Sequence, residues 1–125
     1  MATHNPSQMI SRIAYGDYSA SQYKLLVQDT TTDTYVVTAT TTTTAFLGVL
    51  QNEPETAEAA TVICQGISKV ILGARSTTGN PMTSDSAGRA VPTTQANNYV
   101  IGYCVKGGVT NDIGSVYVSV NQLNA

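Results

Sequence analysis

The sequence predicts an all-β fold: a small β-barrel of short antiparallel strands with an extended N-terminal arm. Three observations support this prediction. Apolar residues occur in short runs or alternate with polar ones, and the segments between them are rich in Gly, Thr and Asn. No stretch of the sequence keeps a helical period. A strand, loop and strand pattern also occurs twice, with a glycine at the same place in each copy.

The repeated pattern indicates two related hairpins. The first copy reads FLGVL, then a polar loop, then TVIC, and the second reads VIGYCV, then a polar loop, then SVYV. The interval from the glycine to a valine of the second strand is 14 residues in both copies, Gly48–Val62 and Gly102–Val116. We therefore expect the same strand register in both. Because a solenoid needs at least three repeats, two hairpins suit a small barrel or sandwich.

The chain is expected to divide into an arm, residues 1–22, and a single β domain, residues 23–125. The arm has no sustained period but is too apolar for an idle disordered tail. A helix over Ser7–Ala14 is an alternative, although we favour an extended arm that adds a strand to the edge of a neighbouring sheet. Four apolar side chains of the arm are the candidate contacts with a partner: Ile10, Ile13, Tyr15 and Tyr18.

The β domain is expected to contain many short strands joined by turns rich in Gly, Thr and Asn. A glycine, Gly66, is interpreted as a break between two strands, and Gly73–Gly88 as the most turn-rich region. Asp29–Asp33 is interpreted as a turn and Thr40–Thr44 as an extended edge or connector. The expected strands are Tyr23–Gln28, Thr34–Thr40, Phe46–Leu50, Thr61–Cys64, Lys69–Leu72, Ala90–Val91, Val100–Val105 and Gly114–Val120.

Composition argues against several classes of partner. Only 11% of residues are charged and the net charge is −2, so we expect neither nucleic acid nor an anionic membrane surface as a partner. No apolar run approaches the roughly 20 residues of a membrane span, and the N-terminus does not read as a signal peptide. We therefore expect synthesis in the cytoplasm. The two cysteines, Cys64 and Cys104, are expected to be buried and unpaired, and a disulfide would require neighbouring strands.

A search for catalytic chemistry finds almost nothing. His4 is the single histidine and lies in the expected arm, so neither a zinc site nor a triad has its usual ligands. Glu53, Glu55 and Glu58 share a loop, but their spacing is not that of a calcium site and Pro54 interrupts it. No phosphate-binding glycine motif is present. We expect no enzyme activity, no cofactor and no metal.

Four motifs, taken in order, resemble the capsid cement (decoration) proteins of tailed phages. In that family a strand of the type IGVLQN is followed by a G-skv turn, a glycine and aspartate turn, and a second strand of the type iGyal. The resemblance covers the chain from about Tyr23 to the C-terminus. The matching segments here are Leu47–Asn52, Gly66–Val70, Gly79–Ala90 and Ile101–Val105.

The resemblance implies a small β-barrel or β-tulip domain that forms a homotrimer on the outside of a phage head. Its partner would be the major capsid protein, whose neighbouring subunits it would clamp at threefold positions against the pressure of the packaged DNA. The family has no catalytic residues to carry over, and the arm and the cysteine pair depart from its pattern. The alternative from the residues themselves is an exposed β-barrel module that binds a carbohydrate or a host receptor.

Overall fold

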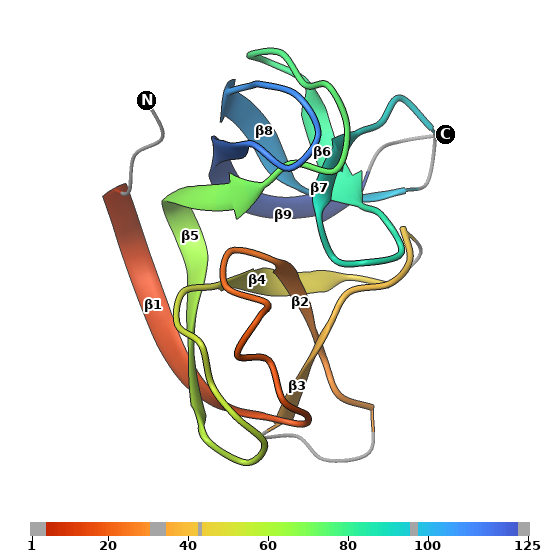
Figure 1. Ribbon diagram of the computed structural model, residues 1–125. Coiled ribbons are helices and arrows are strands. Elements are labelled where there is room, and N and C mark those ends of the chain that lie inside the picture. Colours follow the sequence, from red (N-terminus) through yellow and green to blue (C-terminus); the bar gives the residue numbers. More distant parts are fainter. Residues whose placement is uncertain (1–4, 31–34, 43, 96–97, 123–125) are drawn as a thin grey trace.

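The computed structural model describes residues 5–30, 35–42, 44–95 and 98–122, which form strands and no helix (Figure 1). His4, the end of the Asp29–Asp33 turn, Thr34 and part of the threonine run lie outside them. Most expected strands are present, and Pro81–Ser84 is a further one within the region interpreted as turns. The strands are β1 (Asn5–Ala14), β2 (Leu25–Gln28), β3 (Tyr35–Thr38), β4 (Phe46–Leu50), β5 (Ala59–Ile71), β6 (Pro81–Ser84), β7 (Ala90–Pro92), β8 (Tyr99–Lys106) and β9 (Ile113–Gln122).

The described strands form one sheet that closes into a five-stranded barrel with additional strands. Their order is β1-β3-β2-β4-β5-β9-β8-β6-β7, and β1 also pairs with β5. All the ladders are antiparallel except that between β1 and β3. The predicted all-β small barrel is confirmed.

The long strand β5 connects the two halves of the molecule. Val62 and Ile63 pair with β4, whereas Gly66–Ile71 pairs with β9. The expected break at Gly66 is wrong, because β5 runs continuously through this residue. Gly66 has a φ of 103° and is paired with both β1 and β9. Glycine here lets one strand change direction without losing its neighbours.

The segment expected as an arm is extended, as favoured over a helix, but it has a partner within its own chain. β1 pairs with β5 from Asn5 to Ile13, with shifts in register near Gln8. At the end of β1, the backbone amide of Ala14 donates to the carbonyl of Glu58 (3.0 Å). Ala14 itself is fully buried. Without β1, the long edge of β5 would expose unpaired backbone groups. We therefore count β1 as a strand of this sheet. The proposed boundary at residue 22 stays a prediction.

The two hairpins have the same register, as predicted. In the first, Val49 pairs with Ile63 and Leu50 with Val62. Adding 54 to each number gives Tyr103 with Tyr117 and Cys104 with Val116, which are pairs of the second hairpin. The repeat seen in the sequence is therefore a structural repeat.

The glycine of each hairpin permits a close approach of two backbones. A Cβ atom on Gly48 would overlap the carbonyl oxygen of Ile63, and one on Gly102 would overlap the carbonyl oxygen of Tyr117. These two carbonyls are again 54 residues apart. The shared glycine is therefore a steric requirement of the hairpin, since any side chain would force the two strands apart.

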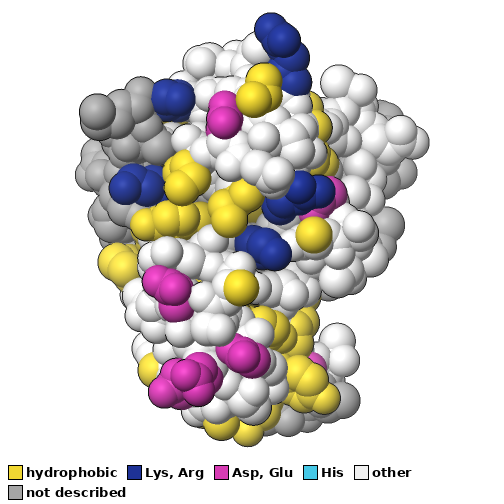
Figure 2. Space-filling view, in the orientation of Figure 1, with side chains coloured by type: hydrophobic (Ala, Val, Ile, Leu, Met, Phe, Trp, Pro, Cys, Tyr) yellow, Lys and Arg dark blue, Asp and Glu magenta, His cyan; other side chains and the backbone are white. Residues whose placement is uncertain are grey.

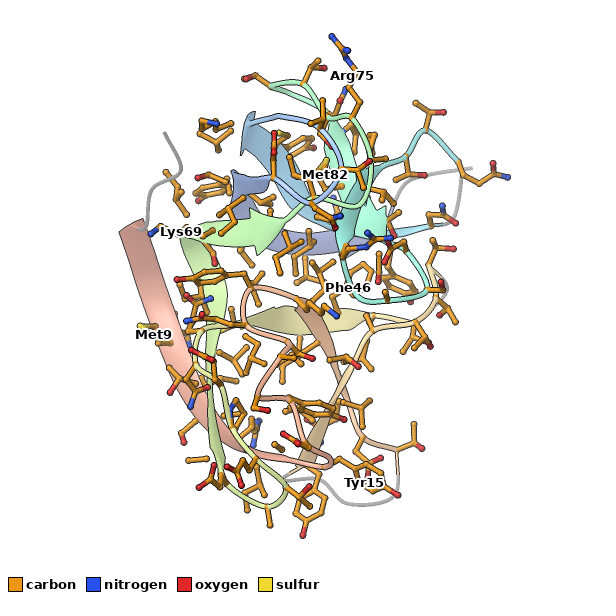
Figure 3. The ribbon with its side chains drawn as sticks, viewed as in Figure 1. Met9, Tyr15, Phe46, Lys69, Arg75 and Met82 are labelled. Carbon is orange, nitrogen blue, oxygen red and sulfur yellow. The ribbon has the colours of Figure 1, made fainter. Side chains whose placement is uncertain are left out.

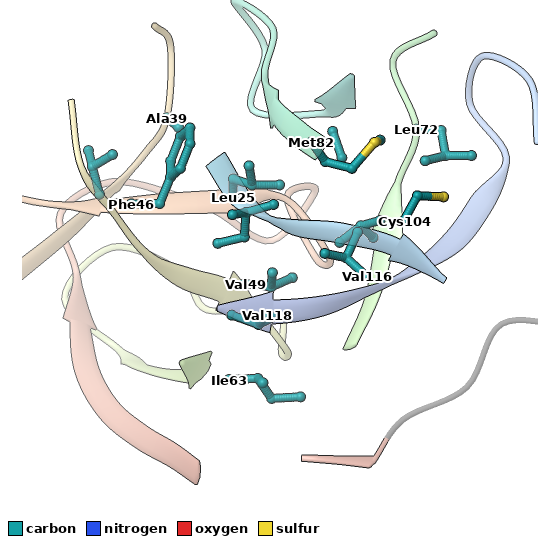
Figure 4. Close-up of a cluster of buried hydrophobic side chains, with 14 residues drawn as sticks. Leu25, Ala39, Phe46, Val49, Ile63, Leu72, Met82, Cys104, Val116 and Val118 are labelled. Atoms are coloured by element: carbon teal, nitrogen blue, oxygen red, sulfur yellow. The ribbon is translucent and has the colours of Figure 1, made fainter. Parts of the chain in front are cut away.

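Two hydrophobic clusters lie on opposite sides of the central strands. Leu25 belongs to the larger cluster and Leu26 to the smaller one, so β2 is covered on both faces. Figure 4 shows the larger cluster, where Met82, Leu72 and Cys104 lie toward one end and Phe46 toward the other. Strands buried on both faces read as continuous apolar runs, which explains the LLV segment of β2. The smaller cluster consists of Leu26, Val36, Leu50, Ala60 and Val62.

Both cysteines are free, as predicted. Cys104 is buried in the larger cluster, whereas Cys64 is only half-buried, with its Sγ 3.7 Å from the carbonyl oxygen of Gln8. The expectation of full burial is therefore wrong for Cys64. A disulfide between them is also excluded by topology, because β9 lies between β5 and β8.

We predict that Gly48→Ala and Gly102→Ala each destabilise the fold by about 1–3 kcal/mol or more, because the new methyl group meets backbone atoms that have no room to move. Gly16→Ala is the matched control, since its Cβ would meet only the ring of Tyr18 at 3.5 Å. Urea unfolding followed by circular dichroism measures the three variants. Equal midpoints for all three and the parent chain would contradict the steric account.

We predict that iodoacetamide alkylates Cys64 well before Cys104 in the native protein. Burial raises the pKa of the Cys104 thiol, and Lys106 partly offsets this effect. At a pH near neutral, the thiolate fraction of Cys104 is therefore smaller than that of a cysteine with the ordinary pKa. Raising the pH toward that pKa should increase the Cys104 rate. Peptide mass spectrometry after timed quenching gives both rates, and unfolding in urea should abolish the difference. Equal native rates would show that the larger cluster opens readily.

Candidate functional site

The described residues contain no group of three or more His, Cys, Asp or Glu side chains that could hold a metal ion. Glu53, Glu55 and Glu58 lie on the β4–β5 loop, and the carboxylate of Glu58 accepts the backbone amide of Glu55 (2.7 Å). No helix in the described part of the chain is long and apolar enough to cross a membrane.

The four predicted contact residues do not form one surface. Ile10 is half-buried and packs against the smaller hydrophobic cluster, and so does Tyr18. Burial raises the pKa of the Tyr18 phenol. Ile13 is also half-buried and lines a shallow depression, whereas Tyr15 is 57% exposed. Ile10 and Tyr18 therefore contribute to the chain's own core, whereas Ile13 and Tyr15 are better placed to contact a partner.

Tyr15 lies at one end of the molecule, remote from Arg75 at the other (Figure 3). Its ring packs edge-on against Tyr35, with the ring centroids 6.2 Å apart. Its backbone amide donates to the carbonyl of Val36 (3.0 Å). The ring is therefore held in place by β3 while most of its surface remains open to solvent.

A depression beside β1 has a volume of about 410 Å³. It is lined by Ser11, Arg12, Ile13, Ala57 and Ala59. The Nε atom of Arg12 is buried and has no hydrogen-bond partner among the described residues. Ala57 and Ala59, on either side of Glu58, line the same depression.

Charge is distributed unevenly along the molecule. In Figure 2 the visible Lys and Arg side chains lie over the upper half, and most acidic ones gather over the lower half. The acids of the upper half are engaged locally: Asp85 pairs with Arg89 (2.8 Å), and Asp112 accepts the amide of Val109 (3.0 Å). The lower half has the glutamates of the β4–β5 loop, which are all exposed. We call this loop, residues 51–58, the acidic loop.

The side of the β5–β9–β8 sheet that faces away from the core is apolar. Tyr103 of β8 lies directly opposite Tyr117 of β9, and they are 51% and 46% exposed. Tyr117 in turn lies opposite Ile67 of β5. We call this surface the outer face. It consists of Ile67, Lys69, Ile71, Tyr103, Val105, Lys106, Ile113 and Tyr117, which surround the buried Ser115.

The repeat shows that this outer face is unusual. Val49 and Ile63 occupy the equivalent positions of the first hairpin, and both are buried in the larger cluster. The equivalent pair in the second hairpin, Tyr103 and Tyr117, is about half exposed. The same hairpin is thus covered on both faces in one copy and on one face in the other.

Sequence analysis found only part of this surface. The alternation in β9 predicts Val116, Val118 and Val120 inward and Ser115, Tyr117 and Ser119 outward. The prediction is wrong for Val120, which is 36% exposed, and for Ser115, which is fully buried; it is correct for the other four. The alternation does not show which strands lie beside β9, and so it misses the cross-strand row of Ile67, Tyr117 and Tyr103. The equal 14-residue intervals were the available signal, because they align Tyr103 with the buried Val49.

The motifs behind the family resemblance build turns. Asn52 closes the β4–β5 loop, because its side chain donates to the carbonyl of Ala59 (2.9 Å) and accepts the amide of Thr61 (3.0 Å). Asp85 accepts the amides of Ala87 and Arg89 at the β6–β7 turn. These residues therefore specify the fold and not a contact surface.

Comparison with known proteins gives a structural likeness only. No protein-family model matches the chain, and no curated protein matches it. Its structure is similar to the crystal structure of the head fiber gp8.5 N base of bacteriophage phi29, with a TM-score of 0.71 and 20% sequence identity. The similarity covers 94% of this chain and 98% of the phage chain. At this identity the likeness shows a shared fold.

Proposed function

We propose that this chain is a structural protein of a tailed-phage head, a cement or decoration protein that binds the outer capsid surface as a homotrimer. The observation that carries the proposal is the likeness to the phi29 head fiber base, which extends over almost the whole of both chains. The ordered motifs independently resemble capsid decoration proteins. The proposed partner is the major capsid protein, the location is the virion surface, and the chain has no enzyme activity.

A weak individual contact is sufficient for this role. A trimer that touches several capsid subunits at once gains from effective concentration, so each contact can be modest. A chain that binds only assembled shells stabilises them by mass action, since it has little affinity for dissociated subunits. Outward pressure from packaged DNA would then have to break these added contacts as well.

The direct experiment is co-sedimentation of the purified chain with undecorated shells. We predict saturable binding in multiples of three copies and a higher temperature of shell disruption in its presence. The control is an unrelated protein of similar size and net charge. Absence of binding to shells, together with specific binding on a glycan array, would reject the cement role in favour of a receptor-binding module.

We further predict that Tyr15 contributes to capsid binding and Ile10 to stability. Tyr15→Ser should leave the melting temperature almost unchanged and weaken shell binding by about tenfold or more, as for a well-placed interface aromatic. Ile10→Ser should lower stability by about 1–3 kcal/mol, because it removes apolar contact with the smaller cluster. Gln95→Ser, on an exposed connector, is the control. Unchanged binding by the Tyr15 variant would move the capsid contact to another surface.

A further inference from the structure

We propose that the outer face is where neighbouring copies of this chain meet, and that it contacts the acidic loop of the next copy. The inference rests on the proposed homotrimer and adds the two surfaces that would build it. Three observations carry it: the apolar character of the outer face, the internal repeat, and the distribution of charge.

The outer face has the composition of an interface core. Tyr103, Tyr117, Ile113 and Val105 are between 39% and 51% exposed. They lie on adjacent paired strands, so they form one surface and are not scattered single residues. Aromatic side chains are enriched at interface cores, and contiguous apolar patches on soluble proteins mark interaction sites.

The repeat allows the outer face to be compared with the equivalent face of the first hairpin. In the first hairpin the equivalent pair, Val49 and Ile63, is buried by other parts of the same chain. In the second hairpin the described chain provides no such cover for Tyr103 and Tyr117. If another molecule covered Tyr103 and Tyr117, the second hairpin would be buried on both faces, as the first hairpin already is.

Charge indicates that the covering element is a second copy. The outer face carries Lys69, whose ammonium lies over the ring of Tyr23 (6.0 Å to the centroid), and Lys106, whose ammonium donates to the carbonyl of Gly107 (3.4 Å). The acidic loop of the same chain carries Glu53 and Glu55, both exposed. A neighbour that presents this loop would place carboxylates near the two lysines around an apolar centre, which is the arrangement that steers and orients association.

The positions of the two surfaces determine the type of assembly. The acidic loop belongs to the lower half of the molecule and the β8–β9 hairpin to the upper half (Figure 1). Two different surfaces that bind each other form a heterologous contact, which repeats around a ring and closes as a trimer if the rotation is 120°. A twofold dimer in which the outer face packs on itself would instead place the lysines of the two copies together.

Charge reversal tests the pairing. Lys69→Glu with Lys106→Glu makes the outer face acidic, and Glu53→Lys with Glu55→Lys makes the loop basic. Each double variant should weaken self-association by about tenfold or more, while the chain with all four changes should recover to within about threefold of the parent. Arg75→Glu, at an exposed position that belongs to neither surface, is the control. Sedimentation velocity measures association, and circular dichroism checks folding.

A second measurement does not depend on variants. Carbodiimide cross-linking of mixed light and ¹⁵N-labelled chains, free and on shells, should join Lys69 or Lys106 of one copy to the 51–58 peptide of another. Lys24 is the internal control. Variants that associate like the parent, or cross-links between copies that exclude these residues, overturn the inference. If the variants form normal trimers but lose shell binding, the outer face binds the capsid and the proposed function stands without this interface.

Discussion

The structure depends on one long strand, β5, which pairs with three others. Its first half lies between β1 and β4, and its second half pairs with β9. Gly66 lets the strand turn between the two halves without interruption. Because β5 joins both hairpins, the N-terminal segment that covers its edge is part of the fold, and Ile10 packs against the smaller cluster. Tyr15 follows directly after β1, so the N-terminal segment contributes both to stability and to the exposed surface.

The second constraint is the close approach of the two strands in each hairpin. Gly48 and Gly102 lie against equivalent carbonyls and give both hairpins one register. With the backbone geometry shared, the difference between the copies lies in their side chains. Val49 and Ile63 are covered by the chain, whereas Tyr103 and Tyr117 carry hydroxyl groups that tolerate water. Such residues suit a surface that is exposed in the free protein and covered in an assembly.

Most of the fold could be predicted from the sequence, because strand alternation, turn residues and the glycine repeat are local signals. The exceptions have long-range causes. Gly66 has the local chemistry of a break, but β1 and β9 hold it within a strand. The N-terminal segment shows no clear period, and its partner, β5, is distant in the sequence, so the sequence alone does not show that it joins the sheet. For the site, Tyr15 could be identified as exposed and apolar, whereas the outer face could not, because it exists only when three strands are placed side by side. The resemblance motifs indicated the fold correctly since they are turn-building residues such as Asn52 and Asp85.

The proposed role of this chain, a structural protein of a phage head surface, is tested most directly by imaging. Undecorated shells saturated with the protein can be reconstructed by electron cryomicroscopy, with untreated shells as the reference. The account predicts additional density on the outside of the shell at threefold positions, into which three copies fit with Tyr15 toward the capsid. Shells that remain bare at saturating protein, or density confined to the inner surface, would contradict it.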